Sequence, residues 1–380
     1  MSVKKLELYF HIPFCVRKCL YCDFLSAPAD EATRKAYMES LLWETKESAG
    51  LYREYTVDTM FIGGGTPSVV DGIWIERLMQ TVFENYRISA EAEITIEVNP
   101  GTVDWEKLCG YRAAGINRLS IGLQSAVDAE MVRLGRIHTW QDFQITYELA
   151  RKAGFTNINV DVMSALPGQT LASYEITLQK LMELTPQPEH VSAYSLIVEE
   201  GTPFGELAEQ GRLELPDEDG ERAMYEITEA VLAKSGFSRY EISNYAKEGY
   251  QCRHNLGYWK RTDYVGFGIG AASLVDNVRF QNESCLEDYI RNPLACGCEK
   301  QVLTVEEQME EFLFLGLRMT EGVDGNAFSQ QFGKTLEEVY GDIIEKNIED
   351  GLLVLRGEHL ALTQRGMDVS NYVMAQFLLS

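Results

Sequence analysis

The 380-residue chain is 45% hydrophobic and 24% charged, and its 58 acidic residues outnumber its 34 basic residues to give a net charge of −24. This composition is typical of a soluble globular protein, and the length predicts a large domain with a smaller one attached. No apolar run reaches the ~18 residues of a membrane span, and the N-terminus lacks a secretory signal, so we expect a cytoplasmic protein with at most peripheral membrane association. The negative field of the chain repels phosphate backbones, so we expect no nucleic-acid partner.

Short β-rich runs recur roughly every 30 residues in the first half of the chain, with helix-like segments between them. The expected strands are 6–11, 57–62, 93–98, 118–123, 157–163 and 190–197. The expected helices are 31–48, 72–86, 104–114, 139–153 and 170–184. This alternation predicts an α/β fold built on a parallel sheet. Six units are fewer than the eight of a closed barrel, so we expect an open, partial (β/α)6 barrel, although a doubly wound sheet fits the same rhythm.

The sequence pattern changes twice in the rest of the chain. A turn-rich segment at 200–216 ends the predicted barrel, and a helix at 217–235 leads into a stretch rich in aromatic residues and glycine. From about 302 onward three helices and an alternating hairpin predict a small winged-helix-like α+β domain, in which few basic residues line the wing. We therefore expect a barrel over 1–215, a connecting region over 216–300 and a C-terminal domain over 301–380, the last with a packing role.

Three cysteines follow the first expected strand with the spacing C-x3-C-x2-C, at Cys15, Cys19 and Cys22. Three thiolates on one tight loop can each bind one iron of a [4Fe–4S] cube and leave the fourth iron open to a chelating ligand that carries an amine and a carboxylate. A zinc site would need a fourth ligand, for which His11 is the nearest candidate. Cys285, Cys296 and Cys298 could bind metal together, but the pattern favours incidental thiols, and Cys109 fits the core face of a helix.

The end of every expected strand carries polar groups or a glycine-rich turn. Strand ends in a parallel α/β fold meet at one edge, where active sites form. The features are the three cysteines, GGGTP at 63–67, Glu97 with Asn99, Gln124 with Ser125, Asp161 with LPGQT at 166–170, and Ser195. We expect them to form one site at the mouth of the barrel.

These residues resemble a known family. The C-x3-C-x2-C loop with Tyr21 before its last cysteine, followed by GGGTP, is similar to the radical S-adenosylmethionine superfamily. YFHIPFCVRKCLYC, FIGGGTPS, EVNPGT, IGLQS, LGRIHT and LPGQT together resemble the branch that contains oxygen-independent coproporphyrinogen III oxidase, from residue 6 to the C-terminus.

The resemblance implies roles for named residues. Cys15, Cys19 and Cys22 would hold the [4Fe–4S] cluster. Contacts with S-adenosylmethionine would come from strand 1, the cluster loop, the glycine turn and the later strand ends, namely from Tyr9, Tyr21, Gly64, Gly65, Thr66, Glu97, Gln124, Arg136 and Asp161. A carboxylate suits the methionyl ammonium, and the planar fork of an arginine suits a carboxylate.

Two features separate the sister functions of this branch. The oxidases usually have a fourth cysteine two places after the third, where this chain has Phe24, and the motif HN-x2-YW of the HemW-type haem chaperones stands at His254, Tyr258 and Trp259. An imidazole can ligate haem iron and aromatic rings can pack on the macrocycle, although from the residues alone a hydrogen-bonded loop histidine is favoured. The resemblance implies a haem chaperone that binds the cluster, S-adenosylmethionine and haem and delivers haem to apo-haemoproteins of the respiratory chain. It leaves a homodimer open. The alternatives are a coproporphyrinogen III oxidase and a radical enzyme acting on RNA, which the charge disfavours.

Overall fold

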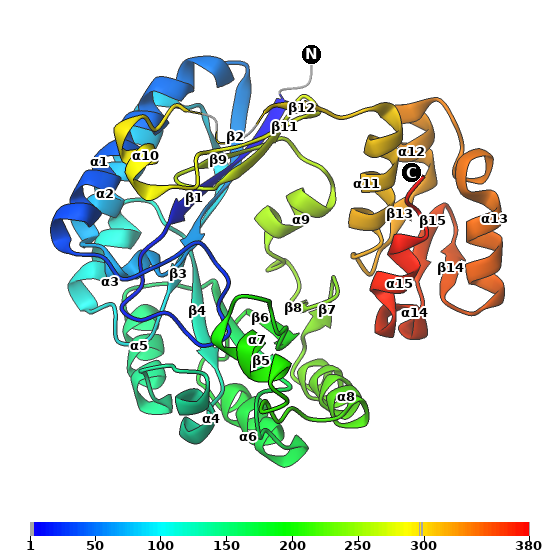
Figure 1. The fold of residues 1–380 in the computed structure, drawn as a ribbon, viewed down its shortest axis with the longest axis horizontal. Helices are drawn as coiled ribbons and strands as arrows, with labels where there is room; N and C mark the ends of the chain where they lie inside the picture. Colours follow the sequence, from blue (N-terminus) through cyan, green and yellow to red (C-terminus); the bar gives the residue numbers. More distant parts are fainter. Residues whose placement is uncertain (1–3, 296, 298, 380) are drawn as a thin grey trace.

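The computed structural model describes residues 4–295, 297 and 299–379. A curved sheet of largely parallel strands is flanked by helices, and a smaller C-terminal unit lies to one side (Figure 1). The first strands are β1 (Lys4–Ile12), β2 (Tyr55–Gly64), β3 (Ile88–Val98), β4 (Arg118–Gln124), β5 (Ile158–Ser164) and β6 (His190–Ser195). The helices between them are α1 (Glu31–Ser48), α2 (Gly72–Asn85), α3 (Trp105–Ala113), α4 (Asp128–Arg133), α5 (Trp140–Lys152) and α6 (Leu171–Met182), with short 3-10 turns η1 (Ala49–Tyr52) and η2 (Pro67–Val69).

Four of the five predicted helices, all but α2, begin at a capping side chain. The Asp30 side chain accepts a hydrogen bond from the Thr33 backbone N–H at 2.8 Å at the start of α1. Thr139 and Asp142 form a reciprocal capping box at the start of α5. Such caps satisfy N–H groups that lack partners within the helix, which is why the sequence located these boundaries well.

The region after β6 adds strands to both edges of the same sheet. The sheet order is β12-β11-β10-β9-β1-β2-β3-β4-β5-β6-β8-β7, with β9 parallel to β1 and β8 antiparallel to β6. The added strands are β7 (Ser238–Arg239), β8 (Asn244–Ala246), β9 (Tyr264–Phe267), β10 (Ala272–Val275), β11 (Val278–Gln281) and β12 (Gln301–Val302). The helices of this region are α7 (Pro203–Glu209), α8 (Glu218–Lys234), α9 (Arg253–Trp259) and α10 (Leu286–Arg291), and α9 lies between the barrel and the C-terminal helices (Figure 1).

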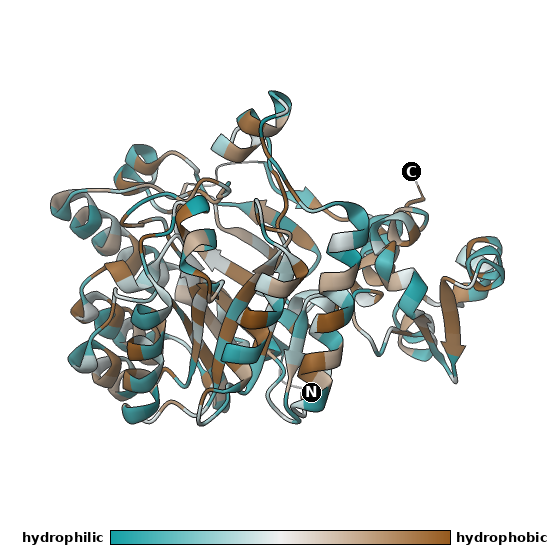
Figure 2. Cartoon of the chain, turned by 90° about the horizontal axis from the view of Figure 1, so that it is seen from below, coloured by the Kyte–Doolittle hydropathy of each residue, from teal (hydrophilic) through white to brown (hydrophobic). Residues whose placement is uncertain are grey.

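The strands present an apolar face to the helices and a polar face to the barrel interior. On β1, the residues Leu6, Leu8 and Phe10 are fully buried in the main hydrophobic core, while Glu7 and His11 point to the opposite face. Figure 2 shows apolar residues along the central strands and hydrophilic residues over much of the outer helices. A polar lumen is unusual for a parallel sheet, whose strands are ordinarily apolar on both faces, and it marks the interior as a place for a ligand.

The C-terminal unit has its own core. A three-stranded sheet, ordered β13 (Val323–Asp324), β15 (His359–Leu362) and β14 (Leu353–Arg356), packs with α11 (Val305–Gly316), α12 (Gly325–Phe332), α13 (Leu336–Glu349), α14 (Gln364–Asp368) and α15 (Ser370–Ala375). Buried Leu313, Phe328 and Tyr340 form the centre of this core. The predicted fold class, a partial barrel with a small winged-helix-like α+β unit, is confirmed. Within the described ranges no helix is both long and apolar enough to cross a bilayer.

Candidate functional site

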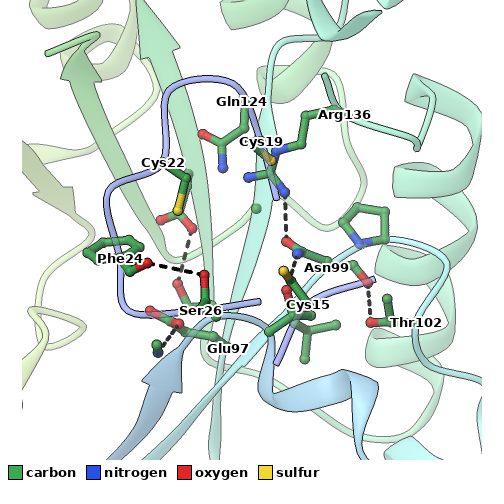
Figure 3. Close-up of a pocket in the computed structure, with 18 of the residues that line it drawn as sticks. Cys15, Cys19, Cys22, Phe24, Ser26, Glu97, Asn99, Thr102, Gln124 and Arg136 are labelled. Carbon is green, nitrogen blue, oxygen red and sulfur yellow. Dashed lines mark hydrogen bonds between the residues drawn. The ribbon is translucent and has the colours of Figure 1, made fainter. Parts of the chain in front are cut away.

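The three cysteines lie in the loop that joins β1 to α1. Backbone hydrogen bonds from Cys15 to Ala27 (3.3 Å) and from Leu20 to Leu134 (3.0 Å) hold this loop over the C-terminal ends of the strands. The thiols form no disulfide, and all three line one pocket of about 430 Å³ (Figure 3). The lining cysteines are Cys15, Cys19 and Cys22.

The donor set fits an iron–sulfur cube better than a single ion. Among the described residues, no three metal-ligating side chains converge on one ion-sized point, which a tetrahedral zinc ion requires. Both ring nitrogens of His11 are engaged, with the Tyr9 hydroxyl at 3.0 Å and the Leu25 carbonyl at 2.9 Å, so His11 is not poised as a fourth ligand. A [4Fe–4S] cube takes one thiolate at each of three separate irons, as three spaced cysteines provide.

The glycine turn after β2 packs directly against the cluster loop. The Gly65 and Thr66 backbone N–H groups donate to Ile12 (2.9 Å) and Phe14 (2.7 Å). A Cβ on Gly65 would lie 2.7 Å from the Phe14 carbonyl oxygen, and Gly64 has a φ of +113°, which L side chains rarely adopt. Glycine is therefore needed here for the close approach of two loops, and this approach places the turn in the pocket wall.

A hydrogen-bonded relay crosses the pocket from the glycine turn to the cluster loop (Figure 3). The Asn99 amide donates to the Thr66 hydroxyl at 2.8 Å, and Arg136 donates to the Asn99 side-chain oxygen at 3.0 Å and to the Tyr21 hydroxyl at 3.1 Å. The buried Arg136 Nε has no hydrogen-bond partner among the described residues. The relay thus brings three predicted residues together through Asn99, which was expected at the mouth of the barrel but not among the S-adenosylmethionine contacts.

Two carboxyl groups line the pocket and favour a cationic ligand. Glu97 accepts from the Gly64 backbone N–H at 3.1 Å, and Asp161 accepts from the Asn159 amide at 2.7 Å. Burial, together with the Asp161 charge, raises the pKa of Glu97 to about 8, and burial also raises the pKa of Asp161. A ligand ammonium beside Glu97 would restore the ionised form and form a charge-assisted pair in a partly dry site.

Gln124 sits at a strained point of the pocket wall. Its φ of +69° is left-handed, and the register between β4 and β5 shifts between Gly122 and Gln124. The Tyr194 hydroxyl donates to the Gln124 side-chain oxygen at 3.1 Å and fixes its position. Backbone strain of this kind costs about 1–3 kcal/mol and is concentrated at functional sites.

Every residue predicted to contact S-adenosylmethionine lines this pocket except Tyr9. The Tyr9 hydroxyl instead bonds to His11, whose other nitrogen bonds to Leu25 in the cluster loop. Tyr9 therefore supports the loop from the strand beneath it.

The HN-x2-YW motif forms α9 and does not bring His254 to the pocket. His254 is 1% exposed, and its ring nitrogens contact the Thr59 hydroxyl at 2.7 Å and the Tyr258 hydroxyl at 3.0 Å. Its ring stacks on Phe61 with centroids 5.3 Å apart. Burial, with a contribution from Arg118, lowers the pKa of His254 to about 3, so the imidazole is neutral at pH 7.

The other end of the motif contacts the C-terminal unit. The Arg318 guanidinium lies 4.4 Å from the Trp259 ring centroid, and Tyr258 packs edge-on against Tyr264 at 4.7 Å. Nearby, Glu311 of α11 binds Arg261 at 2.9 Å. In this conformation α9 fastens the barrel to the C-terminal unit, and the predicted haem contacts of the motif stay a prediction.

Of the remaining cysteines that the structure describes, Cys109, Cys252 and Cys285, none lines the pocket. Cys109 is half-buried on α3, and Cys285 is exposed at the start of α10. Cys296 and Cys298, which could bind metal together with Cys285, lie outside the described residues.

Comparison with known proteins agrees with this geometry. Residues 9–181 match the radical SAM superfamily and residues 303–369 match the HemN C-terminal domain. Proteins named heme chaperone HemW from Lactococcus lactis and Bacillus subtilis are 36% and 37% identical, over 100% and 97% of this chain and 99% and 98% of theirs. The chain belongs to the HemW family of the radical SAM superfamily. That superfamily implies a [4Fe–4S] cluster and S-adenosylmethionine, as predicted.

The structure is also similar to coproporphyrinogen III oxidase (HemN) from Escherichia coli, a radical SAM enzyme. The TM-score is 0.85 at 25% sequence identity, covering 99% of this chain and 90% of that one. The likeness extends through both the barrel and the C-terminal unit, so the family shares this whole architecture with a porphyrin-related enzyme.

Proposed function

We propose that this chain is a haem chaperone that binds a [4Fe–4S] cluster, S-adenosylmethionine and haem, and delivers haem to apo-haemoproteins of respiration. The observation that carries the proposal is the mouth of the pocket. Phe24, at the position of the oxidases' usual fourth cysteine, is 62% exposed and lines the pocket beside three free thiols. The relatives named heme chaperone HemW, which match over nearly their full length, support it.

Three large apolar side chains line the pocket mouth while more than half exposed. They are Val16, Phe24 and Ile137. Exposed apolar groups around a concave polar site favour a flat, apolar ligand such as a porphyrin, because covering a phenylalanine removes apolar surface from water and contributes about 1.5–3 kcal/mol. This rim is our candidate contact surface for the haem macrocycle.

The pocket residues fit the two other cofactors. The three thiols would hold the cluster. Glu97 would bind the methionyl ammonium, and Arg136, with its free Nε, would bind the methionyl carboxylate. When bound, the cluster and S-adenosylmethionine supply reductive radical chemistry; the chain's own residues bind and orient them and limit the access of water.

The similarity to the oxidase supports one alternative. A true oxidase would decarboxylate two propionates of coproporphyrinogen III after hydrogen abstraction. The whole-chain structural match to HemN favours the oxidase, whereas a phenylalanine at position 24, where the oxidases usually have a cysteine, favours the chaperone.

The haem recipients would be apo-haemoproteins of the respiratory chain, and we place the exchange in the cytoplasm with at most peripheral contact with a membrane. The net charge of −24 supports a protein partner over a nucleic acid. A homodimer remains part of the proposal, to be tested by comparing the apo and cluster-loaded chain by gel filtration.

An anaerobic comparison separates the two functions. The cluster is reconstituted, and the protein is offered hemin or, separately, coproporphyrinogen III with S-adenosylmethionine and a reductant. We expect a stable Soret band with hemin and no protoporphyrinogen from the second mixture. Turnover of coproporphyrinogen III would overturn the proposal.

A further inference from the structure

A row of β4 side chains lines the pocket from its mouth to its floor. Arg118, Ser120, Gly122 and Gln124 alternate along the strand and all border the pocket. At a rise of about 3.3 Å per residue, the Cα of Arg118 lies ~13 Å below that of Gly122. Arg118 is therefore well below the glycine turn and the cluster loop.

Arg118 is a buried cation with no ion-pair partner. Its side chain is 1% exposed, its Nε has no hydrogen-bond partner, and none of the acidic groups in the described part of the chain lies within 4.0 Å of it. Although burial disfavours the charged form, the nearby Cys252 and Glu93 side chains raise the pKa of Arg118, so the guanidinium stays charged without a hydrogen-bonded partner at its Nε. A planar guanidinium that borders a pocket in this way is suited to bind an anion from within that pocket.

The acidic groups nearest to Arg118 are held by other donors. Glu93 accepts from the backbone N–H groups of Arg253 and His254, each at 3.2 Å. Asp161 accepts from the Asn159 amide at 2.7 Å. Both carboxylates act on the guanidinium through space, but neither forms an ion pair with it.

The floor also offers neutral hydrogen-bonding groups. Ser120, Asn159, Ser192, Asn244 and Asn255 border the same pocket as Arg118. A small monoanion suits this set, because hydroxyl and amide groups can satisfy its outer lone pairs. A doubly charged phosphate suits it less than a carboxylate, because Asp161 borders the same cavity and repels the larger charge more strongly.

The pocket thus contains two guanidinium groups at different depths. Arg136 lies at the mouth, bonded to Tyr21 of the cluster loop and to Asn99, where the methionyl carboxylate is expected. S-adenosylmethionine carries a single carboxylate, which leaves Arg118 for a second acid group. The cavity volume of about 430 Å³ lies at the small end of ligand pockets, so it suits one elongated ligand and an acidic side arm better than a whole macrocycle.

We propose that the pocket floor centred on Arg118 is a carboxylate subsite that takes a propionate of the haem whose macrocycle rests on the apolar rim. The inference rests on the proposed haem function, and it adds the group by which the haem is oriented. The two conceivable sources of the carboxylate are haem and S-adenosylmethionine, and the experiment distinguishes them.

The test compares two ligands on the full, cluster-reconstituted chain. Hemin and hemin dimethyl ester share the iron and the macrocycle, but the ester lacks both carboxylates. Soret titrations should give at least a tenfold tighter dissociation constant for hemin, since hydrogen bonds to charged groups contribute roughly a factor of ten or more. Equal affinities for the two ligands would overturn the subsite while leaving haem binding, and so the proposed function, intact.

Variants then locate the effect. Arg118→Gln should weaken the binding of hemin about tenfold and leave the affinity for the dimethyl ester unchanged. The hemin affinity of Arg118→Lys should lie between those of the wild type and Arg118→Gln, because a lysine keeps the charge and loses the planar fork of the guanidinium. Arg291→Gln, a change at an exposed arginine of α10 (76% exposed), is the matched control. The ligand comparison on the wild type needs no variant, so it decides the question even where a buried substitution unfolds the chain.

A separate titration with S-adenosylmethionine identifies the carboxylate. We expect its affinity to be unchanged in Arg118→Gln and lowered in Arg136→Gln. Loss of S-adenosylmethionine binding in Arg118→Gln, with hemin binding intact, would assign the floor to the methionyl group and overturn the proposal. Failure of the wild type to bind either hemin or its ester would instead refute the proposed function.

Discussion

His254 offers the sharpest test of how α9 is held in the barrel. The change His254→Ala removes a buried ring that stacks on Phe61 and leaves the Tyr258 hydroxyl without its hydrogen-bond partner, whereas Thr59 keeps its contact with Glu7. Truncation of a buried ring costs about 3–5 kcal/mol, and the one orphaned hydroxyl adds ~1 kcal/mol. We expect the free energy of unfolding to fall by about 4–6 kcal/mol, a large fraction of the usual 5–15 kcal/mol.

The assay is urea unfolding of the full chain at pH 7, followed by circular dichroism. His254→Gln, which keeps one hydrogen-bonding group, should lose less than half as much stability. His359→Ala, at the half-exposed wing histidine, should change stability by less than about 0.5 kcal/mol.

The same variant tests haem ligation. Because both ring nitrogens of His254 hold α9 in place, we expect the Soret maximum of bound hemin to be unchanged in the variant. A His254→Ala protein that unfolds like the wild type and loses the Soret band would refute this reasoning. It would mean that α9 swings out and that His254 ligates the iron.

Three further predictions concern the pocket and its base. Cys19→Ser should abolish the brown chromophore and lower iron content after reconstitution, whereas Cys109→Ser, outside the pocket, should leave both intact; an unchanged Cys19→Ser protein would exclude the cluster assignment. Phe24→Ser should weaken the binding of hemin about tenfold in Soret titrations, because apolar contact with the macrocycle is lost. An equal loss of hemin affinity in Phe83→Ser, a change at a half-exposed phenylalanine on α2, would contradict a specific role for the rim. Burial raises the pKa of Glu7 to about 9, so the folded chain keeps a proton that the unfolded chain releases above pH ~4.5, and this group's contribution to stability falls as pH rises between those values. In urea titrations between about pH 5.5 and 8, the free energy of unfolding of Glu7→Gln should therefore rise relative to that of the wild type by up to ~1.4 kcal/mol per pH unit. If the free energies of unfolding of the two proteins change with pH in parallel, Glu7 is ionised in the folded chain.

The mouth of the barrel could be predicted from the sequence because parallel strands end at a common edge. Each βαβ unit places the residues at or just after the end of its strand at that edge. Four residues therefore had to lie near one another, namely Cys15, Gly64, Glu97 and Gln124. Helix starts could also be predicted, because a capping side chain such as Asp30 bonds to a backbone group only a few residues further along the chain.

The placement of α9 could not be read in this way. His254 contacts Thr59, and its backbone contacts Glu93, over separations of more than 150 residues, which no local pattern encodes. The edge strands β7 and β12 have two residues each, too few for an alternation to be recognised. Tyr9 was expected at the pocket from the family resemblance, but its hydroxyl contacts His11 instead.

Arg118 was missed although a signal existed. It opens a strand in which every second residue, through Ser120, Gly122 and Gln124, faces the lumen. An arginine at the start of a strand is ordinarily expected at a solvated end, and only the folded structure shows that this one is 1% exposed.

Haem transfer is the most direct test of the proposed function. The cluster-reconstituted protein, loaded with one equivalent of hemin, is mixed with a respiratory apo-cytochrome, and the acceptor's Soret band is followed with time. We predict that the acceptor is loaded faster than from an equimolar hemin–albumin control, and that the Soret band of the donor falls in step. Haem that stays on the protein, or an acceptor that fills at the control rate, would contradict a chaperone.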